Sequence, residues 1–261
     1  MDRALNENEV MNRGGPNLSR SLLRYSNSWK RSLQRLPLWS RKSRQHMLFA
    51  NREHAAKLLV ERLSAYCEQD NPLVLAIPRG AVPMARIIAD ELGGSLDVIL
   101  VRKLGHPGQP ELAIGAIDEG GNTFFSAWAA EVSSSYIESE KQQQLALLQK
   151  RRTQYTPMRE AINPCGRLVI VVDDGTATGS TMIAALRSVR ARQPKKLIAA
   201  VAVASPEAAK LLLSECDALV CLETPADFSA VGQFFNDFSQ VSDEEVIELL
   251  TSRQEKISVF A

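Results

Sequence analysis

The sequence has few of the features that mark membrane, metal-binding or disulfide-rich proteins. Its longest apolar run, residues 197–204, is about one strand long, far short of the roughly 18–20 residues that span a bilayer. The four cysteines include no Cys-x-x-Cys pair, and the three histidines are scattered along the chain. We therefore expect no membrane span, no zinc site, and reduced thiols as in a cytoplasmic protein.

Two common phosphate-binding signatures are also missing. The chain contains neither the Walker Gly-Lys-Ser/Thr sequence nor the dinucleotide fingerprint Gly-x-Gly-x-x-Gly. Hydrophobic residues at 45% and charged residues at 23% are ordinary globular values, which excludes disorder of the whole chain. The length of 261 residues allows one large domain or two small ones.

The net charge of +1 is the sum of two unlike parts. Residues 1–46 hold ten Lys and Arg against three Asp and Glu, a net +7, whereas residues 47–261 hold 21 against 27, a net −6. A small total therefore conceals a basic tail on an acidic body. We expect two parts, a basic extension over residues 1–46 and a folded domain over residues 47–261.

The basic tail carries an apolar pattern of its own. Five apolar residues recur there at steps of three or four: Leu22, Tyr25, Trp29, Leu33 and Leu36. A helix with that stripe would suit an anionic membrane surface, a partner protein or nucleic acid, and the Arg- and Ser-rich composition also resembles a transit peptide. The other interpretations are a disordered extension and a translation start at Met47. We expect a disordered extension, and nucleic-acid binding only through it.

The body alternates between short aliphatic runs and helical patterns. The predicted strands are 73–77, 97–101, 168–172, 197–204 and 218–221, and the predicted helices are 52–67, 83–92, 133–152, 181–191 and 206–214. Uninterrupted aliphatic strands imply burial on both faces, and hence a parallel sheet covered by helices. Ligands of such sheets bind beyond the carboxyl ends of the strands, so we expect the ligand-binding residues in the loops after Ile77, Val101 and Val172.

The loop after Val172 carries the main functional signal. Two carboxylates, two glycines and four hydroxyl side chains occur between Asp173 and Thr181, just before a predicted helix. Adjacent carboxylates at a strand end are costly unless they bind cations or hydroxyls. The start of a helix offers free N–H groups to a phosphate. The segment therefore suits a ligand with hydroxyls at one end and a phosphate at the other, such as a ribose 5-phosphate.

The same segment resembles a known motif. Val171–Thr181, Val-Val-Asp-Asp-Gly-Thr-Ala-Thr-Gly-Ser-Thr, is similar to the phosphoribosyl-pyrophosphate (PRPP) motif of type I phosphoribosyltransferases. Leu75–Pro83 resembles their pyrophosphate loop, and Val101–Gly105 with Pro110–Ala116 resembles the strand and flexible loop that follow. Residues 223–246 are similar to an uncharacterised prokaryotic branch of the family. The likeness covers about residues 47–250 and leaves the first 46 without a counterpart.

The resemblance implies a fold and a set of site residues. The fold would be that of type I phosphoribosyltransferases, an α/β fold with a mostly parallel sheet flanked by helices and a small hood. The PRPP-binding residues would be Asp173, Asp174, Gly175, Thr176, Ala177, Thr178, Gly179, Ser180 and Thr181. Asp173 and Asp174 would bind the ribose hydroxyls, directly or through Mg²⁺ as the cofactor. Arg79 and Gly80 would bind pyrophosphate.

Arg102 and Lys103 would be the catalytic cations that neutralise the pyrophosphate as it leaves. Gly105, Pro107 and Gly108 suit a lid over PRPP, but they suit any turn equally.

Two further features concern the acceptor. Some purine-salvage members carry an Asp, assigned as the base, where this chain has Ala177, which argues against hypoxanthine-guanine salvage by that route. Four phenylalanines follow the last predicted strand: Phe228, Phe234, Phe235 and Phe238. Their rings suit either stacking on an acceptor base or packing within a small subdomain. A homodimer is a further open expectation.

Two functions remain as hypotheses. The first is an Mg²⁺-dependent pentosyltransferase that moves the phosphoribosyl group between PRPP and a nitrogen acceptor, a nucleobase or an amine, with release of pyrophosphate. The second is a catalytically silent, PRPP-binding regulator. Arg102, Lys103 and the glycine-rich loop favour the enzyme, because a sensor has less need of a loop that handles pyrophosphate. Residues 1–46 show no helix-turn-helix pattern that would favour a regulator.

Overall fold

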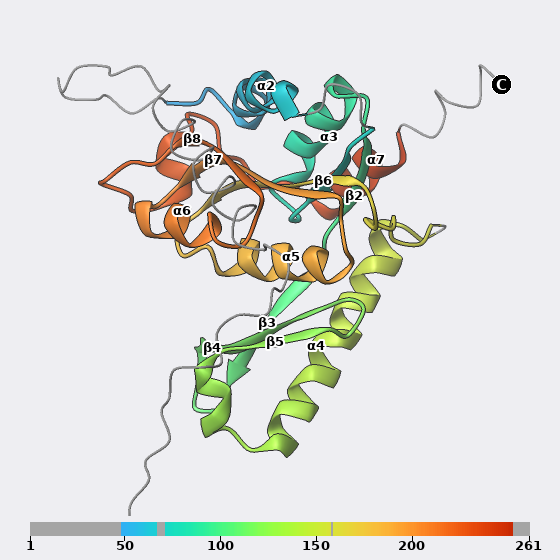
Figure 1. Ribbon diagram of the computed structural model, residues 1–261, viewed down its shortest axis with the longest axis vertical. Helices are drawn as coiled ribbons and strands as arrows, with labels where there is room; N and C mark the ends of the chain where they lie inside the picture. Colours follow the sequence, from blue (N-terminus) through green and yellow to red (C-terminus); the bar gives the residue numbers. More distant parts are fainter. Residues whose placement is uncertain (1–47, 67–70, 158, 253–261) are drawn as a thin grey trace, which may run out of the picture. The chain divides into compact units, whose positions relative to one another are not determined.

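The computed structural model describes residues 48–66, 71–157 and 159–252 (Figure 1). The predictions for residues 1–46 lie outside these ranges. Within the described part of the chain, no helix is both long and apolar enough to cross a membrane.

A five-stranded parallel sheet forms the centre of the described domain (Figure 1). The strands lie in the order β2-β1-β6-β7-β8, and each neighbouring pair is parallel. Their bounds are Leu73–Ala76 for β1, Ser95–Val98 for β2, Leu168–Thr176 for β6, Lys196–Ala204 for β7 and Ala218–Glu223 for β8. The predicted parallel sheet is confirmed.

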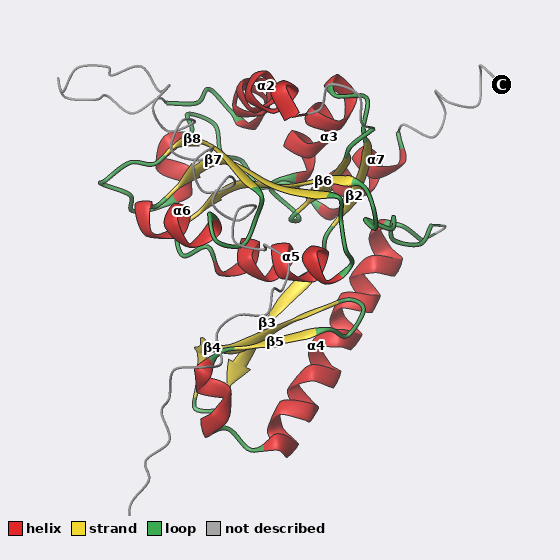
Figure 2. Ribbon diagram, viewed as in Figure 1, coloured by secondary structure: helices red, strands yellow, loops and turns green. Residues whose placement is uncertain are grey.

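Helices cover both faces of this sheet, as Figure 2 shows. One face carries α2 (Arg52–Leu63), α3 (Val82–Glu91) and α7 (Asp243–Thr251), and the other carries α5 (Ser180–Ala191) and α6 (Pro206–Leu212). Along β6, Val169 and Val171 enter one hydrophobic core while Ile170 and Val172 enter the other. Burial on both sides is why this strand is uniformly aliphatic.

A second sheet corrects the prediction for residues 97–116. The predicted strand 97–101 ends at Val98, and the chain then leaves the parallel sheet. It forms an antiparallel sheet from β3 (Val101–His106), β4 (Gln109–Asp118) and β5 (Thr123–Phe125), backed by the long helix α4 (Ser134–Tyr155). The loop predicted after Val101 is therefore largely a hairpin. Its strands have a solvated face and mix polar with apolar residues, so they lack the aliphatic run of a fully buried strand.

Two further differences concern element ends. Strand β6 continues past Val172 to Thr176, because β7 pairs with it as far as Ala204, so the acidic pair lies within the strand rather than after it. Helix α2 ends at Leu63 and passes into a 3₁₀ turn over Ser64–Tyr66, shorter than the predicted helix 52–67. Two more 3₁₀ turns occupy Ala127–Glu131 and Val231–Phe234.

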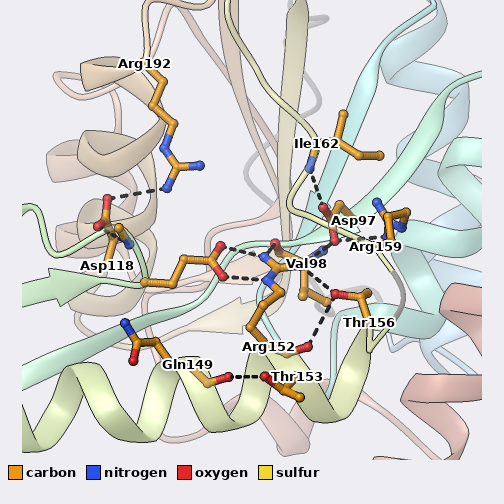
Figure 3. A network of polar contacts seen from close by, with 12 residues as sticks. Asp97, Val98, Asp118, Gln149, Arg152, Thr153, Thr156, Arg159, Ile162 and Arg192 are labelled. Atoms are coloured by element: carbon orange, nitrogen blue, oxygen red, sulfur yellow. Dashed lines mark hydrogen bonds and ion pairs between the residues drawn. The ribbon is translucent and has the colours of Figure 1, made fainter.

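A buried polar network attaches α4 and the antiparallel sheet to the parallel one (Figure 3). Asp97, 1% exposed, accepts a 2.8 Å hydrogen bond from Nη1 of Arg152 on α4 and another of 2.8 Å from the Ile162 N–H. The same guanidinium donates to both carboxylate oxygens of Glu119, which follows β4. Arg159 adds a 3.2 Å contact to Asp97. One arginine therefore joins β2, α4 and the end of β4.

Candidate active site

The segment between β6 and α5 is a tight turn built to present N–H groups. Gly179 adopts φ 75°, in the left-handed region that favours glycine, and its N–H donates to the Thr176 hydroxyl at 2.9 Å. The hydroxyls of Thr178 and Ser180 lie 3.0 Å apart at the start of the helix. Ser205 donates a 2.7 Å hydrogen bond to the Ala177 carbonyl, which braces the turn from the end of β7. The first turn of α5 thus offers N–H groups and hydroxyls to an anion.

The acidic pair lies at the carboxyl end of β6, directly before this turn. The Asp173 side chain accepts a 3.0 Å hydrogen bond from the Asp174 N–H. Burial, followed by repulsion from the Asp174 carboxylate, raises the pKa of Asp173 well above its ordinary value. Burial also raises the pKa of Asp174, and the Arg52 guanidinium opposes that rise. Two desolvated carboxylates side by side favour a bound cation or hydroxyl donors, which would offset their repulsion.

The loop after β1 reaches the same place. The Ile77 N–H donates to the Val172 carbonyl at 3.0 Å, and the loop ends where the Val82 N–H bonds the Arg79 carbonyl at 3.0 Å. A Cβ added to Gly80 would lie 2.2 Å from Oδ2 of Asp174, so the backbone at this position lies directly against the acidic pair. Gly80 and Asp174, predicted from separate motifs, are therefore brought together. The Arg79 side chain is exposed.

Arg102 and Lys103 point to opposite sides of β3, as neighbouring residues of a strand must. Nε of Arg102 donates to Gln144 of α4, and the Arg102 side chain lines a cavity of about 60 Å³ together with Pro78 and Thr181. Lys103 instead lines a different cavity of about 280 Å³, against α5, which Ser180 also borders. The two predicted cations thus lie in separate cavities, and Arg102 is the one that shares a cavity with the pyrophosphate loop.

Two arginines that lie at this site are absent from the predicted set of site residues. Arg151 of α4 lines the same 60 Å³ cavity as Arg102. Its charge and that of Arg79 both act on Tyr155, whose burial raises its pKa to about 12 while the two arginines oppose the rise. The only sequence signal was the dibasic pair 151–152, which does not say which arginine faces the site. Arg52 bonds to Asp174 across 122 residues of sequence, and no local pattern indicates that contact.

The phenylalanines after β8 form part of a packed cluster. Phe234 and Phe235 are 3% and 6% exposed, and Phe49 joins them with its ring centroid 5.2 Å from that of Phe235. Phe228 packs on Phe234 at 5.7 Å, and Phe238 stacks on Phe235 at 4.9 Å. The interpretation as subdomain packing is confirmed for Phe234 and Phe235. The Phe238 ring also contacts Arg52, next to the acidic pair.

Comparison with known proteins agrees with this geometry. The family model for the phosphoribosyl transferase domain matches residues 45–235. Two candidate phosphoribosyl transferases, from two strains of Mycobacterium tuberculosis, are each 39% identical over 206 residues, which is 78% of this chain and 46% of theirs. The chain thus spans about half the length of these curated relatives. The crystal structure of TT1426 from Thermus thermophilus matches with TM-score 0.73 and 43% identity, over 79% of this chain and 99% of that one.

The fold and the site together define an α/β class of protein, with a parallel sheet whose carboxyl edge joins an acidic pair to the turn that begins α5. The chain belongs to the phosphoribosyl transferase family, and it has the type I fold that its sequence resembles.

Proposed function

We propose that the protein transfers the 5-phosphoribosyl group between PRPP and a nitrogen acceptor, releasing pyrophosphate in the forward direction. The observation that carries this proposal is the convergence at one strand end. The acidic pair, the start of α5 and the Gly80 backbone meet there, although they come from separate parts of the chain. The proposal extends to residues 47–261 as the transferase domain, with residues 1–46 as a separate basic extension, and to a cytoplasmic location.

At the ribose end, Asp173 and Asp174 would accept hydrogen bonds from the two ribose hydroxyls. The N–H groups and hydroxyls of 177–181 would hold the 5-phosphate at the positive end of α5. These two contacts fix the sugar at both ends, so the anomeric carbon lies between them. Such positioning lowers the barrier because the reacting atoms no longer lose their freedom at the transition state.

At the pyrophosphate end, the Gly80 N–H and three guanidinium groups would receive the leaving group. The guanidinium groups are those of Arg79, Arg102 and Arg151. Negative charge grows on the leaving pyrophosphate as the bond to the anomeric carbon breaks, and fixed cations stabilise that charge. Lys103, which borders the neighbouring cavity, would assist from the α5 side.

The residues present fit a magnesium ion that arrives with its substrate. Within the described ranges no three His, Cys, Asp or Glu side chains gather into a metal cage. Mg²⁺ often uses one or two carboxylates and completes its shell with water and substrate phosphates. Asp173 and Asp174 would supply those contacts, and the ion would offset charge on the pyrophosphate.

Calorimetric titration of the full chain with Mg²⁺-PRPP tests the binding site. We expect binding by the unchanged protein and its loss in Asp174→Asn, which removes the charge that orders the ribose hydroxyls. Glu53→Gln is the matched control, because among the described residues Glu53 pairs with Lys57 alone, on the exposed side of α2. Absence of binding by the unchanged protein would refute the proposed function.

Turnover requires a second measurement. Pyrophosphate release is followed across a panel of nucleobases and amines with Mg²⁺-PRPP present. Release with at least one acceptor supports the transferase. Tight PRPP binding with no release for any acceptor would instead favour a catalytically silent PRPP sensor.

A further inference from the structure

Among the described ion pairs, the one between Arg52 and Asp174 includes a residue of the proposed ribose site. Arg52 is the first residue of α2, and its Nε and Nη2 atoms both lie 2.9 Å from Oδ2 of Asp174. The two side chains are only 12% and 13% exposed, so the ion pair is largely shielded from water. Both contacts end on the same carboxylate oxygen, Oδ2.

The guanidinium is fixed on its other sides as well. Its Nη1 atom donates a 2.7 Å hydrogen bond to the Ser239 carbonyl, and its Cζ lies 3.9 Å from the centroid of the Phe238 ring. The edge of the guanidinium thus donates hydrogen bonds while its face lies against the Phe238 ring. A planar guanidinium can make both contacts at once, and a lysine ammonium cannot. The arginine has one defined position relative to Asp174.

The backbone around Arg52 explains that fixed position. Phe49 forms a parallel bridge to Phe235: its N–H donates to the Phe234 carbonyl at 2.8 Å, and its carbonyl accepts from the Asn236 N–H at 2.8 Å. The Asn51 side chain then begins α2 by accepting the His54 N–H at 2.9 Å. Segments 49–52 and 234–239 thus form one small unit, and Arg52 is the side chain by which this unit contacts the acidic pair.

Gly80 lies on the same contact. A Cβ at this position would be 3.2 Å from Nη2 of Arg52 as well as 2.2 Å from Oδ2 of Asp174. The pyrophosphate loop, the acidic pair and the start of α2 therefore meet at one carboxylate oxygen. A purely structural ion pair would not need to be at this junction, since the partner of Arg52 is one of the groups that would bind the ribose.

We infer that Arg52 is a positioning residue for the ribose of PRPP, which fixes the Asp174 carboxylate through Oδ2 and leaves Oδ1 for a ribose hydroxyl. This inference rests on the proposed function. The fixed cation also offsets one of the two adjacent negative charges without contacting Asp173. The acidic pair can therefore remain ordered before its ligand arrives, which reduces the cost of ordering it on binding.

Two probes separate this role from a purely structural one. Ribose 5-phosphate contains the part of PRPP that Asp174 would bind, and pyrophosphate without Mg²⁺ contains the part that it would not, because the ion that Asp174 would contact is left out. In Arg52→Gln we expect the dissociation constant for ribose 5-phosphate and for Mg²⁺-PRPP to rise roughly 10- to 100-fold, as for a misplaced positioning group. The constant for pyrophosphate without Mg²⁺ should change less than about twofold, because the contacts of the pyrophosphate end remain.

Two further variants serve as controls. Arg52→Lys keeps the charge but loses the paired donors, so it should recover part of the ribose 5-phosphate affinity. Phe238→Leu keeps the ion pair and removes the stacked ring, so it should lower the melting temperature while changing ribose 5-phosphate affinity less than Arg52→Gln does.

The outcomes are distinct. An equal loss of affinity for both probes in Arg52→Gln, or affinity unchanged for both, would overturn the inference while leaving the proposed function intact. If Arg52→Gln does not fold, the same comparison is made with Arg52→Lys, in which a selective loss for ribose 5-phosphate supports the inference and a uniform one overturns it. Failure of the unchanged protein to bind Mg²⁺-PRPP would refute the proposed function, and the inference with it.

Discussion

Substituting Gly80 by alanine tests the junction of the pyrophosphate loop with the acidic pair. The added methyl carbon would lie 2.2 Å from Oδ2 of Asp174, whereas ordinary contact begins at 3.4 Å, so the two groups must separate by about 1 Å. Neither side can withdraw freely. Oδ2 is held by a hydrogen bond from Nε and an ion-pair contact from Nη2 of Arg52, and the loop is tied to β6 at Ile77. We expect a stability loss of about 1–3 kcal/mol from overpacking.

The effect on binding should be comparable in free energy to this loss of stability. A displacement of about 1 Å at a positioned group can cost roughly 100-fold, so Gly80→Ala should raise the dissociation constant for Mg²⁺-PRPP by about that factor. Calorimetric titration measures the constant, and thermal unfolding reports stability on the same samples. Affinity within about twofold of the unchanged protein, with the fold retained, would refute the proposed convergence of the loop and Asp174.

Gly93→Ala is the matched control for this experiment. Gly93 follows α3 at the end remote from the site, with φ 63° and no atom within 4 Å of an added Cβ. The left-handed backbone should cost alanine about 1–2 kcal/mol of stability without any steric contact. The control variant should therefore melt earlier and still bind Mg²⁺-PRPP normally, which separates a general loss of stability from damage to the site.

Three other predictions follow from separate parts of the fold. Arg102→Ala should weaken Mg²⁺-pyrophosphate binding more than Lys103→Ala does, because Arg102 shares a cavity with the pyrophosphate loop and Lys103 lines another. A larger effect of Lys103→Ala would contradict this assignment. Asp97→Asn should lower the free energy of unfolding in urea by about 1.5–3 kcal/mol, because it weakens charged hydrogen bonds from Arg152 and Arg159 while Arg152 stays paired with Glu119; a loss below about 1 kcal/mol would contradict the importance of the network. Burial raises the pKa of Cys216 to about 11 and of Cys221 to about 12, from 9.0, so above pH 9 the unfolded chain loses these protons first. The urea midpoint should therefore fall between pH 9 and pH 11, and less steeply when both thiols are replaced by serine.

The parallel sheet could be predicted because its strands are buried on both faces. Residues 168–172 and 197–204 are aliphatic throughout, since each strand packs against helices above and below. The acidic pair and the turn after it were predictable for a related reason. Their chemistry is contiguous in sequence, so one short segment displays both the carboxylates and the hydroxyl- and glycine-rich turn.

The antiparallel sheet and the position of Arg52 could not be predicted, because they depend on contacts that the linear sequence does not display. The antiparallel sheet has a solvated face, so its hairpin, which turns between His106 and Gln109, looks like a loop. Arg52 meets Asp174 only because Phe49 pairs with Phe235, more than a hundred residues away. A lone arginine after a helix cap carries no signal of its own, and its position at the site follows from the closure of two distant segments.

Two neighbouring residues of helix α4 make different contacts, and these contacts restrict how the antiparallel sheet can move. Arg152 joins Asp97 and Glu119 in the buried network, while Arg151 lines the cavity shared with the pyrophosphate loop. A movement of the whole antiparallel sheet over a ligand would have to break the network or carry α4 with it.

The hairpin is tied to α4 as far as Gly105, whose carbonyl accepts the Tyr136 hydroxyl at 3.2 Å. The pairing of β3 with β4 shifts register on both sides of Gly105, so the regular pairing is interrupted just before the tip over residues 106–109. If the protein binds PRPP as we propose, closure over the ligand should therefore be confined to this tip, with Arg102 and Arg151 already in place before it closes.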